Sequence, residues 1–177
     1  MADKKELTHL DENGKVKMVD VGQKEITHRQ AKAFSKVFMD SRTLSLIKEN
    51  KIKKGDVLTV AKIAGIFAAK QTSNLIPLCH PLSLSRVDLD LKINESEQAV
   101  EIIACVEAND RTGVEMEALT CAAIAALTIY DMCKSVDQKM VISEVKLLEK
   151  SGGKSGKWKR NQGKLITAET RSSQRKK

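Results

Sequence analysis

The stretch LSRVDLDLKINESEQAVEIIACV, residues 84–106, decides the fold class of this chain. Apolar and charged residues alternate strictly from Val87 to Ile93. Because successive side chains of a strand point to opposite faces, this alternation predicts a half-buried β-strand over residues 84–93. The polar run at 94–97 predicts a turn, and the renewed alternation over 100–106 predicts the antiparallel partner strand of a β-hairpin.

The segments on either side of this hairpin are predicted to add strands and helices. Small apolar residues alternate with polar residues over 26–39, which favours a strand. Apolar residues at three- and four-residue spacing predict a helix over 56–68 with Asp56 as its N-cap, and a shorter helix begins at Thr43. A final strand is predicted over 140–148.

The longest predicted helix runs from about residue 114 to 136 and is apolar on almost every side from Leu119 to Ile129. Such a helix is buried on more than one side. Thr112 and Glu115 fit the capping box, in which the threonine caps the helix and the glutamate reaches back to the threonine amide. Capping is therefore a structural explanation of Glu115 that competes with a functional one.

The predicted elements follow the order strand, helices, strand, strand, helix, strand. This order matches the βαββαβ plan of the ferredoxin-like α+β fold, in which helices cover one face of an antiparallel sheet. We expect this domain to occupy residues 25–157, after a coil segment over 1–24 and before a basic, disordered tail over 158–177. The other sheet face and the apolar long helix need a cover, which predicts a homo-oligomer.

Length and composition are those of one globular domain. The chain has 177 residues, of which 41% are hydrophobic and 31% charged, and this excludes the disordered and collagen-like classes. No stretch approaches the roughly 20 apolar residues of a membrane span, and the charged first residues lack the apolar core of a signal peptide. We therefore expect a cytoplasmic protein without membrane attachment.

The formal net charge of +8 comes from the C-terminal tail. Residues 150–177 carry ten lysines and arginines against one acid, whereas residues 1–149 carry 21 bases against 22 acids. The five aromatic residues match no RNA-stacking signature. The charge thus predicts solubility and loose attraction to polyanions, and no specific nucleic-acid partner.

The four cysteines show no CxxC spacing, so we expect structural thiols. The only adjacent metal-ligand types are Cys79 and His80, and no zinc site is predicted. Both residues belong to the stretch IPLCHP, residues 76–81, which contains both prolines of the chain. The prolines hold Leu78, Cys79 and His80 in a stiff loop. The imidazole of His80 can titrate near neutral pH or serve as a hydrogen-bonded structural group, and both roles stay open here.

Several charged residues stand at the ends of the predicted helices. Lys54 is a cation close to a helix start and Asp131 is an anion in a last turn, so both oppose the helix macrodipole. Asp131 and Lys134 share a helix face and could pass protons or form a weak ion pair. Met116 and Glu117 lie in a first turn, where free amides favour anionic ligands.

The glycine-rich stretch KSGGKSG, residues 150–156, offers cations and backbone donors suited to phosphate. It lacks the spacing of a Walker loop. A flexible tail linker is the competing explanation.

Five stretches together closely resemble the cyclic pyranopterin monophosphate synthase family, the molybdenum cofactor biosynthesis protein C. They are KKGDV at 53–57, IPLCHP at 76–81, TGVEMEAL at 112–119, YDMCK at 130–134 and KSGGKSG at 150–156. The resemblance runs from about residue 7 to 157. The tail beyond it departs from the short ending usual in the family, so no function is assigned to the tail.

This resemblance implies a lyase that acts on 3′,8-cyclised dihydro-GTP, a small molecule supplied by a partner radical enzyme. The reaction rearranges the purine-derived rings into a pyranopterin, releases pyrophosphate and leaves a cyclic phosphate. Asp131 matches the active-site acid of the family, and Lys54 and Lys134 match its catalytic lysines. The implied substrate-binding residues are Leu78, Cys79, His80, Met116, Glu117, Glu115, Lys70 and Lys150.

The same resemblance implies a hexamer built as a trimer of ferredoxin-like dimers. No residue pattern in the sequence requires a cofactor. Whether magnesium accompanies the triphosphate stays open. Two other classes compete with the lyase: a non-catalytic nucleotide- or RNA-binding ferredoxin-like module, supported by the basic tail, and a purely structural oligomer. The unusual residues gather at loops and helix ends, whereas the cations of the tail follow no motif, and this favours the enzyme.

Overall fold

The computed structural model describes residues 14–154 and 156–161 of the chain. In chain order the elements are β1 (Thr27–Phe38), α1 (Ser41–Lys48), α2 (Val57–Lys70), α3 (Thr72–Leu75), β2 (Leu84–Asn94), β3 (Ala99–Asp110), α4 (Glu115–Cys133), β4 (Val141–Ser151) and β5 (Trp158–Lys159). β2 and β3 form the predicted hairpin, which turns over residues 95–98.

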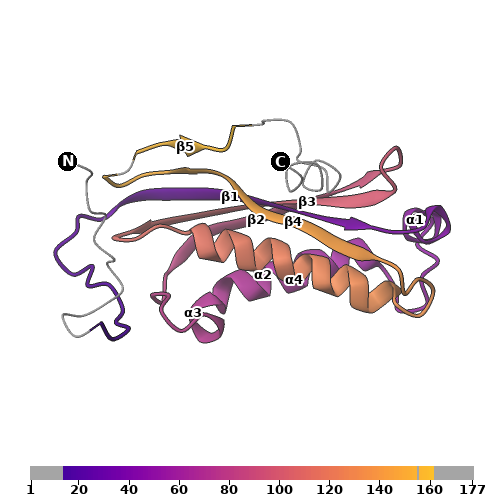
Figure 1. Ribbon diagram of the computed structural model, residues 1–177, viewed down its shortest axis with the longest axis horizontal. Coiled ribbons are helices and arrows are strands. Elements are labelled where there is room, and N and C mark those ends of the chain that lie inside the picture. Colours follow the sequence, from indigo (N-terminus) through magenta and orange to yellow (C-terminus); the bar gives the residue numbers. More distant parts are fainter. Residues whose placement is uncertain (1–13, 155, 162–177) are drawn as a thin grey trace, which may run out of the picture.

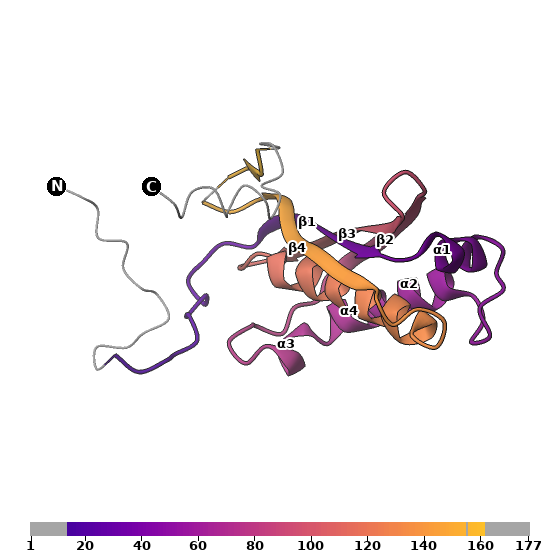
Figure 2. The same ribbon diagram turned by 45° about the vertical axis from the view of Figure 1, so that its right-hand side comes forward.

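All strands pair antiparallel in one sheet with the order β2-β3-β1-β4-β5. The helices α2 and α4 cover one face of this sheet, and α1 lies beyond one end of it (Figure 1). α4 packs on β1, β3 and β4, while α2 packs on α4 and β2 (Figure 2). The four long strands and the two covering helices have the predicted arrangement, so the ferredoxin-like α+β fold is confirmed.

The core lies between the sheet and the two covering helices. Alternate residues of β1, among them Ala31, Ala33 and Val37, point to this side and are fully buried. Small side chains in α4 let the helix lie close to the sheet. α2 approaches α4 closely at Gly65, where an added Cβ atom would lie 2.9 Å from the carbonyl oxygen of Cys121. The glycine is therefore part of the helix contact.

The uncovered sheet face carries aromatic rings overlaid by lysines. Lys36 Nζ lies 5.7 Å from the ring centre of Phe34, and Lys146 Nζ lies 5.0 Å from the same ring. Lys36 also forms ion pairs with Glu97 at 2.6 Å and Glu101 at 3.1 Å. Cation–π contacts and ion pairs thus cover these rings with the chain's own side chains.

The start of α4 differs from the predicted capping box. Its N-cap is Val114, and no side chain caps the first amides, so the prediction of Thr112 as the N-cap is wrong. Glu115 instead forms a 2.7 Å ion pair with Lys150 of β4. The Glu115 carboxylate is therefore engaged by a lysine from a distant strand and not by the backbone of its own helix start.

The start of α2 agrees with the prediction. Asp56 is the N-cap, and its carboxylate accepts a 3.0 Å hydrogen bond from the amide of Thr59. Of the described helices, α4 alone has the length and apolar composition of a membrane span. It packs against α2 and against β1, β3 and β4, as a core helix does.

β5 lies at the start of the segment predicted to be a tail. Trp158 and Lys159 extend the sheet beyond β4. Residues 162–177, which make up the rest of that segment, lie outside the described residues, as do residues 1–13 of the predicted coil.

Candidate active site

Three charged side chains meet at the C-terminal end of α4. Nζ of Lys54 donates hydrogen bonds to Oδ2 and to the backbone carbonyl of Asp131, both over 2.8 Å. Nζ of Lys134 lies 2.8 Å from Oδ1 of the same carboxylate. We call Lys54, Asp131 and Lys134 the carboxylate cluster. Because α2 begins beside the end of α4, the two charges that oppose their own helix dipoles pair with each other.

The carboxylate of Asp131 stays ionised at neutral pH. Hydrogen bonds from Lys134 and Lys54 lower the pKa of Asp131 to about 2, and the carboxylate in turn raises the pKa of Lys134. The Asp131 side chain is 57% exposed, so solvent has direct access to it. The arrangement therefore offers two cationic proton donors held by an ionised carboxylate.

A buried carboxyl group lies at the opposite end of α4. Glu117 is only 4% exposed in the first turn of the helix. Burial is the main cause that raises its pKa to about 7, with a further contribution from the negative charge of Glu115. Burial, together with the charge of Glu117, also raises the pKa of the Cys79 thiol. Glu117 can thus gain or lose a proton close to neutral pH beside a thiol that stays neutral.

The predicted stiff loop connects α3 to β2 and carries Leu78, Cys79 and His80, all half-buried. Nε2 of His80 donates a 2.8 Å hydrogen bond to the backbone carbonyl of Val19. This bond ties the segment before β1 to the loop. His80 therefore has a structural hydrogen-bond partner. The neighbouring loop residue Cys79 lies close enough to Glu117 for the charge of Glu117 to raise the pKa of its thiol.

A pocket of about 840 Å³ opens beside the start of α4. Glu115, Thr112 and Gly113 line it from one side, and residues 150–154 of the glycine-rich stretch line it from another. Five cations face it: Lys24, Arg29, Arg111, Lys150 and Lys154. Its acids are Glu25 and Glu115, so cations are in excess and the pocket suits a phosphate-bearing anion.

Arg29 and Arg111 were not predicted as site residues. Arg29 donates hydrogen bonds from Nε to the carbonyl of Asp110, over 3.2 Å, and from Nη2 to the carbonyl of Arg111, over 3.1 Å. An added Cβ atom at Gly153 would overlap the Arg29 guanidinium, so the two residues are packed together. Only the pairing of β1 with β3 and β4 brings these residues into one place, and no local sequence signal reveals that pairing.

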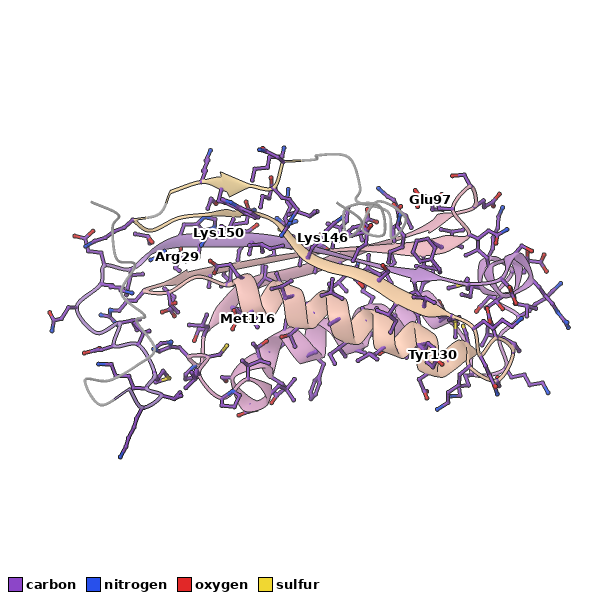
Figure 3. The ribbon with its side chains drawn as sticks, viewed as in Figure 1. Arg29, Glu97, Met116, Tyr130, Lys146 and Lys150 are labelled. Atoms are coloured by element: carbon purple, nitrogen blue, oxygen red, sulfur yellow. The ribbon has the colours of Figure 1, made fainter. Side chains whose placement is uncertain are left out.

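The predicted site residues thus fall into two groups at opposite ends of α4. Figure 3 shows Arg29 and Lys150 at the end of the sheet near Met116, while Tyr130 lies at the far end of the helix. Met116 is partly exposed at this first end. Lys70, in the last turn of α2, is exposed at the same end because α2 runs antiparallel to α4.

The two groups do not meet within one chain. Fourteen residues separate Glu117 from Asp131, which corresponds to about 21 Å along a helix axis. The described residues, 14–154 and 156–161, contain no group of three or more His, Cys, Asp or Glu side chains arranged to hold a metal.

Comparison with known proteins identifies the family. The model of the MoaC family matches residues 18–153, which is most of the chain. A cyclic pyranopterin monophosphate synthase of Thermomicrobium roseum is 56% identical over 155 residues, which cover 88% of this chain and 93% of that protein. The proteins of the same name from Peptoclostridium acidaminophilum and Heliobacterium modesticaldum are 51% and 54% identical, each over 88% of this chain and 98% of their own length. The chain therefore belongs to the MoaC family.

Proposed function

We propose that this protein is a cyclic pyranopterin monophosphate synthase of molybdenum cofactor biosynthesis. As a lyase it converts 3′,8-cyclised dihydro-GTP to cyclic pyranopterin monophosphate and releases pyrophosphate. The observation that carries this proposal is the carboxylate cluster, an ionised carboxylate held between two lysines at a solvent-accessible helix end. The relatives that bear this enzyme name match nearly the whole described chain.

Asp131 and the two lysines supply the proton transfers of the reaction. Opening and closing the rings requires protons to be removed from and returned to ring nitrogen and oxygen atoms. The Asp131 carboxylate stays ionised because its pKa is about 2, and it holds in place the ammonium groups of Lys54 and Lys134, which donate protons to the substrate. Each positioned group can contribute a factor of about 10² to 10⁴ in rate.

The cation-lined pocket receives the triphosphate. When an oxygen of the substrate attacks the first phosphorus atom, the bond to the bridging oxygen breaks and pyrophosphate leaves with its negative charge. Lys150 and the arginines of the pocket neutralise that charge, and the glycine-rich stretch adds backbone donors. Magnesium could share this charge, and the carboxylates of the pocket, Glu25 and Glu115, are the groups able to hold it there.

The loop with Leu78, Cys79 and His80 and the first turn with Met116 and Glu117 bind the ring system. The three loop residues are half-buried in a partly apolar setting that suits a flat heterocycle. The buried Glu117 offers a carboxyl group that can donate or accept a hydrogen bond near pH 7. Lys70 and Glu115 lie at the same end of α4 and complete the proposed substrate-binding residues there.

A complete site requires two chains, because one small substrate cannot span the two ends of α4. The outer faces of α2 and α4 between these ends expose large apolar side chains: Val60, Ile63, Phe67 and Leu127. Ile63 and Phe67 are 62% and 63% exposed, which indicates a surface that needs a partner. A second copy related by a two-fold axis would bring its carboxylate cluster to the Glu117 end of the first. We infer such a dimer and its assembly into a cytoplasmic hexamer.

The decisive experiment incubates the purified protein with 3′,8-cyclised dihydro-GTP. The product is oxidised and its pterin fluorescence measured, and released pyrophosphate is quantified in parallel. Equal amounts of pterin and pyrophosphate support the proposed function. A folded protein that binds the nucleotide but forms neither product would instead be the non-catalytic nucleotide-binding module.

A further inference from the structure

β5 closes the outer edge of the sheet next to the cation-lined pocket. In this strand Trp158 pairs with Lys150, and Lys159 pairs with Glu149. The family model ends at residue 153, so this strand lies beyond the part of the chain that defines the family. Lys150, by contrast, is one of the pocket cations. An element outside the family match therefore contacts the backbone of a site residue.

The residue after β5 fastens the strand to β4. The amide of Arg160 donates a 2.7 Å hydrogen bond to the carbonyl of Leu148, and Nε of Arg160 donates another, also over 2.7 Å, to the carbonyl of Leu147. The Arg160 guanidinium lies 5.6 Å from the ring centre of Trp158, within the range of a cation–π contact. We call Trp158 and Arg160 the edge anchor.

Strand pairing fixes the direction of the Lys150 side chain. Lys150 lies opposite Ala31 on one side and opposite Trp158 on the other. Directly opposed residues of antiparallel strands point to the same face, and Ala31 is buried on the helix-covered face. Lys150 consequently points to that face, where it meets Glu115 over 2.7 Å. Lys159 and its partner point to the other face.

Without the edge anchor, Lys150 would stand at the end of an open edge strand. The chain leaves β4 through Gly152 and Gly153, both in the left-handed region with φ values of 101° and 68°. Glycine residues lose more conformational freedom on folding than any other residue, so this stretch gives β4 little rigidity. Pairing on both sides of β4 is what keeps the backbone at Lys150 in place.

We propose that the edge anchor is a positioning element that holds Lys150 in the pocket and so sets the affinity of the pocket for the phosphate chain of its ligand. The inference rests on the proposed function only in naming that ligand as a nucleotide triphosphate. The edge anchor itself stays outside the chemistry. Loss of the edge anchor should therefore weaken phosphate binding, while the rate at saturating substrate should stay within a few-fold of that of the unmutated protein.

The test compares full-length variants that carry the same net charge. Trp158→Ala combined with Arg160→Gln removes the aromatic ring and the guanidinium, whereas Lys159→Gln removes one cation from the other sheet face. Binding of inorganic triphosphate is measured by isothermal titration calorimetry. We expect the double variant to raise the Kd about tenfold, which corresponds to the loss of roughly one charged hydrogen bond. The control should change the Kd less than twofold.

Repeating both variants in a Lys150→Ala background separates positioning from a direct contact. If the edge anchor acts through Lys150, the double variant has no further effect on the Kd there. Three results would each overturn the inference. The double variant could weaken triphosphate binding equally in both backgrounds, or it could leave the Kd unchanged. Lys159→Gln could also weaken binding as much as the double variant does. Turnover is measured separately: triphosphate binding without turnover of 3′,8-cyclised dihydro-GTP by the unmutated protein would refute the proposed function and not the role of the edge anchor.

Discussion

Lys54 and Asp131 are 77 residues apart in sequence, yet Nζ of the lysine lies 2.8 Å from the carboxylate of the aspartate. The lysine precedes α2 and the aspartate lies in the last turn of α4. Each charge is unfavourable for its own helix dipole, and the side chains are 44% and 57% exposed. An exposed ion pair contributes little to stability. Such a pair, formed at a cost to both helices, is typical of a functional site.

Asp131→Asn should abolish turnover with little change in stability. Loss of the carboxylate removes the charge that holds Lys54 and Lys134 in place, so we expect kcat to fall by at least about 10²-fold. The low pKa of Asp131 means that its charge stabilises the fold above pH 4, and that this contribution disappears as the pH falls towards 2. Because the group is exposed, the thermal midpoint at pH 7 should stay close to that of the unmutated protein. Activity assays and thermal melts check both expectations.

A structural role for Asp131 would give the opposite pair of results. The midpoint would fall by many degrees, and activity per folded molecule would be retained. Asp88→Asn provides a matched control, because Asp88 forms exposed ion pairs with Lys62 and Arg86, none of which belongs to the carboxylate cluster. This control should leave both activity and the midpoint unchanged.

Glu117→Gln should stabilise the protein at alkaline pH. The pKa of Glu117 is raised to about 7, so between pH 4.5 and 7 the folded protein binds more protons than the unfolded chain. Stability therefore falls as the pH rises through this window, and the full penalty of a buried charge is present above it. At pH 8 we expect the glutamine variant to gain on the order of 2 to 3 kcal/mol in the free energy of unfolding.

Urea unfolding at pH 4 and pH 8 measures this difference. The advantage of Glu117→Gln should vanish at pH 4, where the carboxyl group is protonated in both the folded and the unfolded state. An advantage of the same size at both pH values would mean that the carboxylate is not held in a desolvating environment. Asp131→Asn is the comparison with an exposed carboxylate and should show no gain at pH 8.

Gly65→Ala should destabilise the helix layer although alanine is the better helix former. The added Cβ atom would lie 2.7 Å from Cδ2 of Leu89 and 2.9 Å from the carbonyl of Cys121. Overpacking of this kind costs about 1 to 3 kcal/mol, against a gain of at most about 1 kcal/mol in helix propensity. Urea unfolding should show the net loss, and a variant as stable as the unmutated protein would contradict the close helix contact. Ala64→Gly, one position earlier, gives the cost of propensity alone.

The sequence predicted the sheet and the main helices because side-chain periodicity reports burial directly. The hairpin of β2 and β3 and the N-cap Asp56 are both present. The predicted cap at Thr112 was wrong because local motifs do not reveal distant partners. Glu115, which the capping box requires, forms its ion pair with Lys150 instead. Two-residue β5 escaped prediction since its pairing depends on Arg160 contacts with β4 rather than on any pattern.

The candidate site was predicted to an uneven degree. Dipole arguments and the family resemblance singled out Lys54 and Asp131, and the structure brings these two together. Arg29 and Arg111 could not have been predicted, because neither residue opposes a helix dipole as Lys54 and Asp131 do. They line the same pocket only because β1 pairs with β3. The hydrogen bond from His80 to Val19 likewise joins segments that no local pattern connects.

The proposed composite site, formed by two chains, predicts the outcome of a complementation experiment. Glu117→Ala and Asp131→Asn each inactivate every site of a homodimer, because every composite site receives one lesion. A mixed dimer differs, since its two-fold symmetry places both lesions in one site and none in the other. Co-refolding the two inactive variants in equal amounts should therefore restore activity.

The recovered activity has a defined value. Random association makes half of the dimers mixed, and each mixed dimer has one intact site of two, so about a quarter of the activity of the unmutated protein is expected. Differently tagged chains verify that mixing has occurred. Mixed dimers without any activity would mean that Glu117 and Asp131 act on one substrate within a single chain. Because about 21 Å of helix separates the two residues, that result would require a rearrangement of α4 and would refute the composite site.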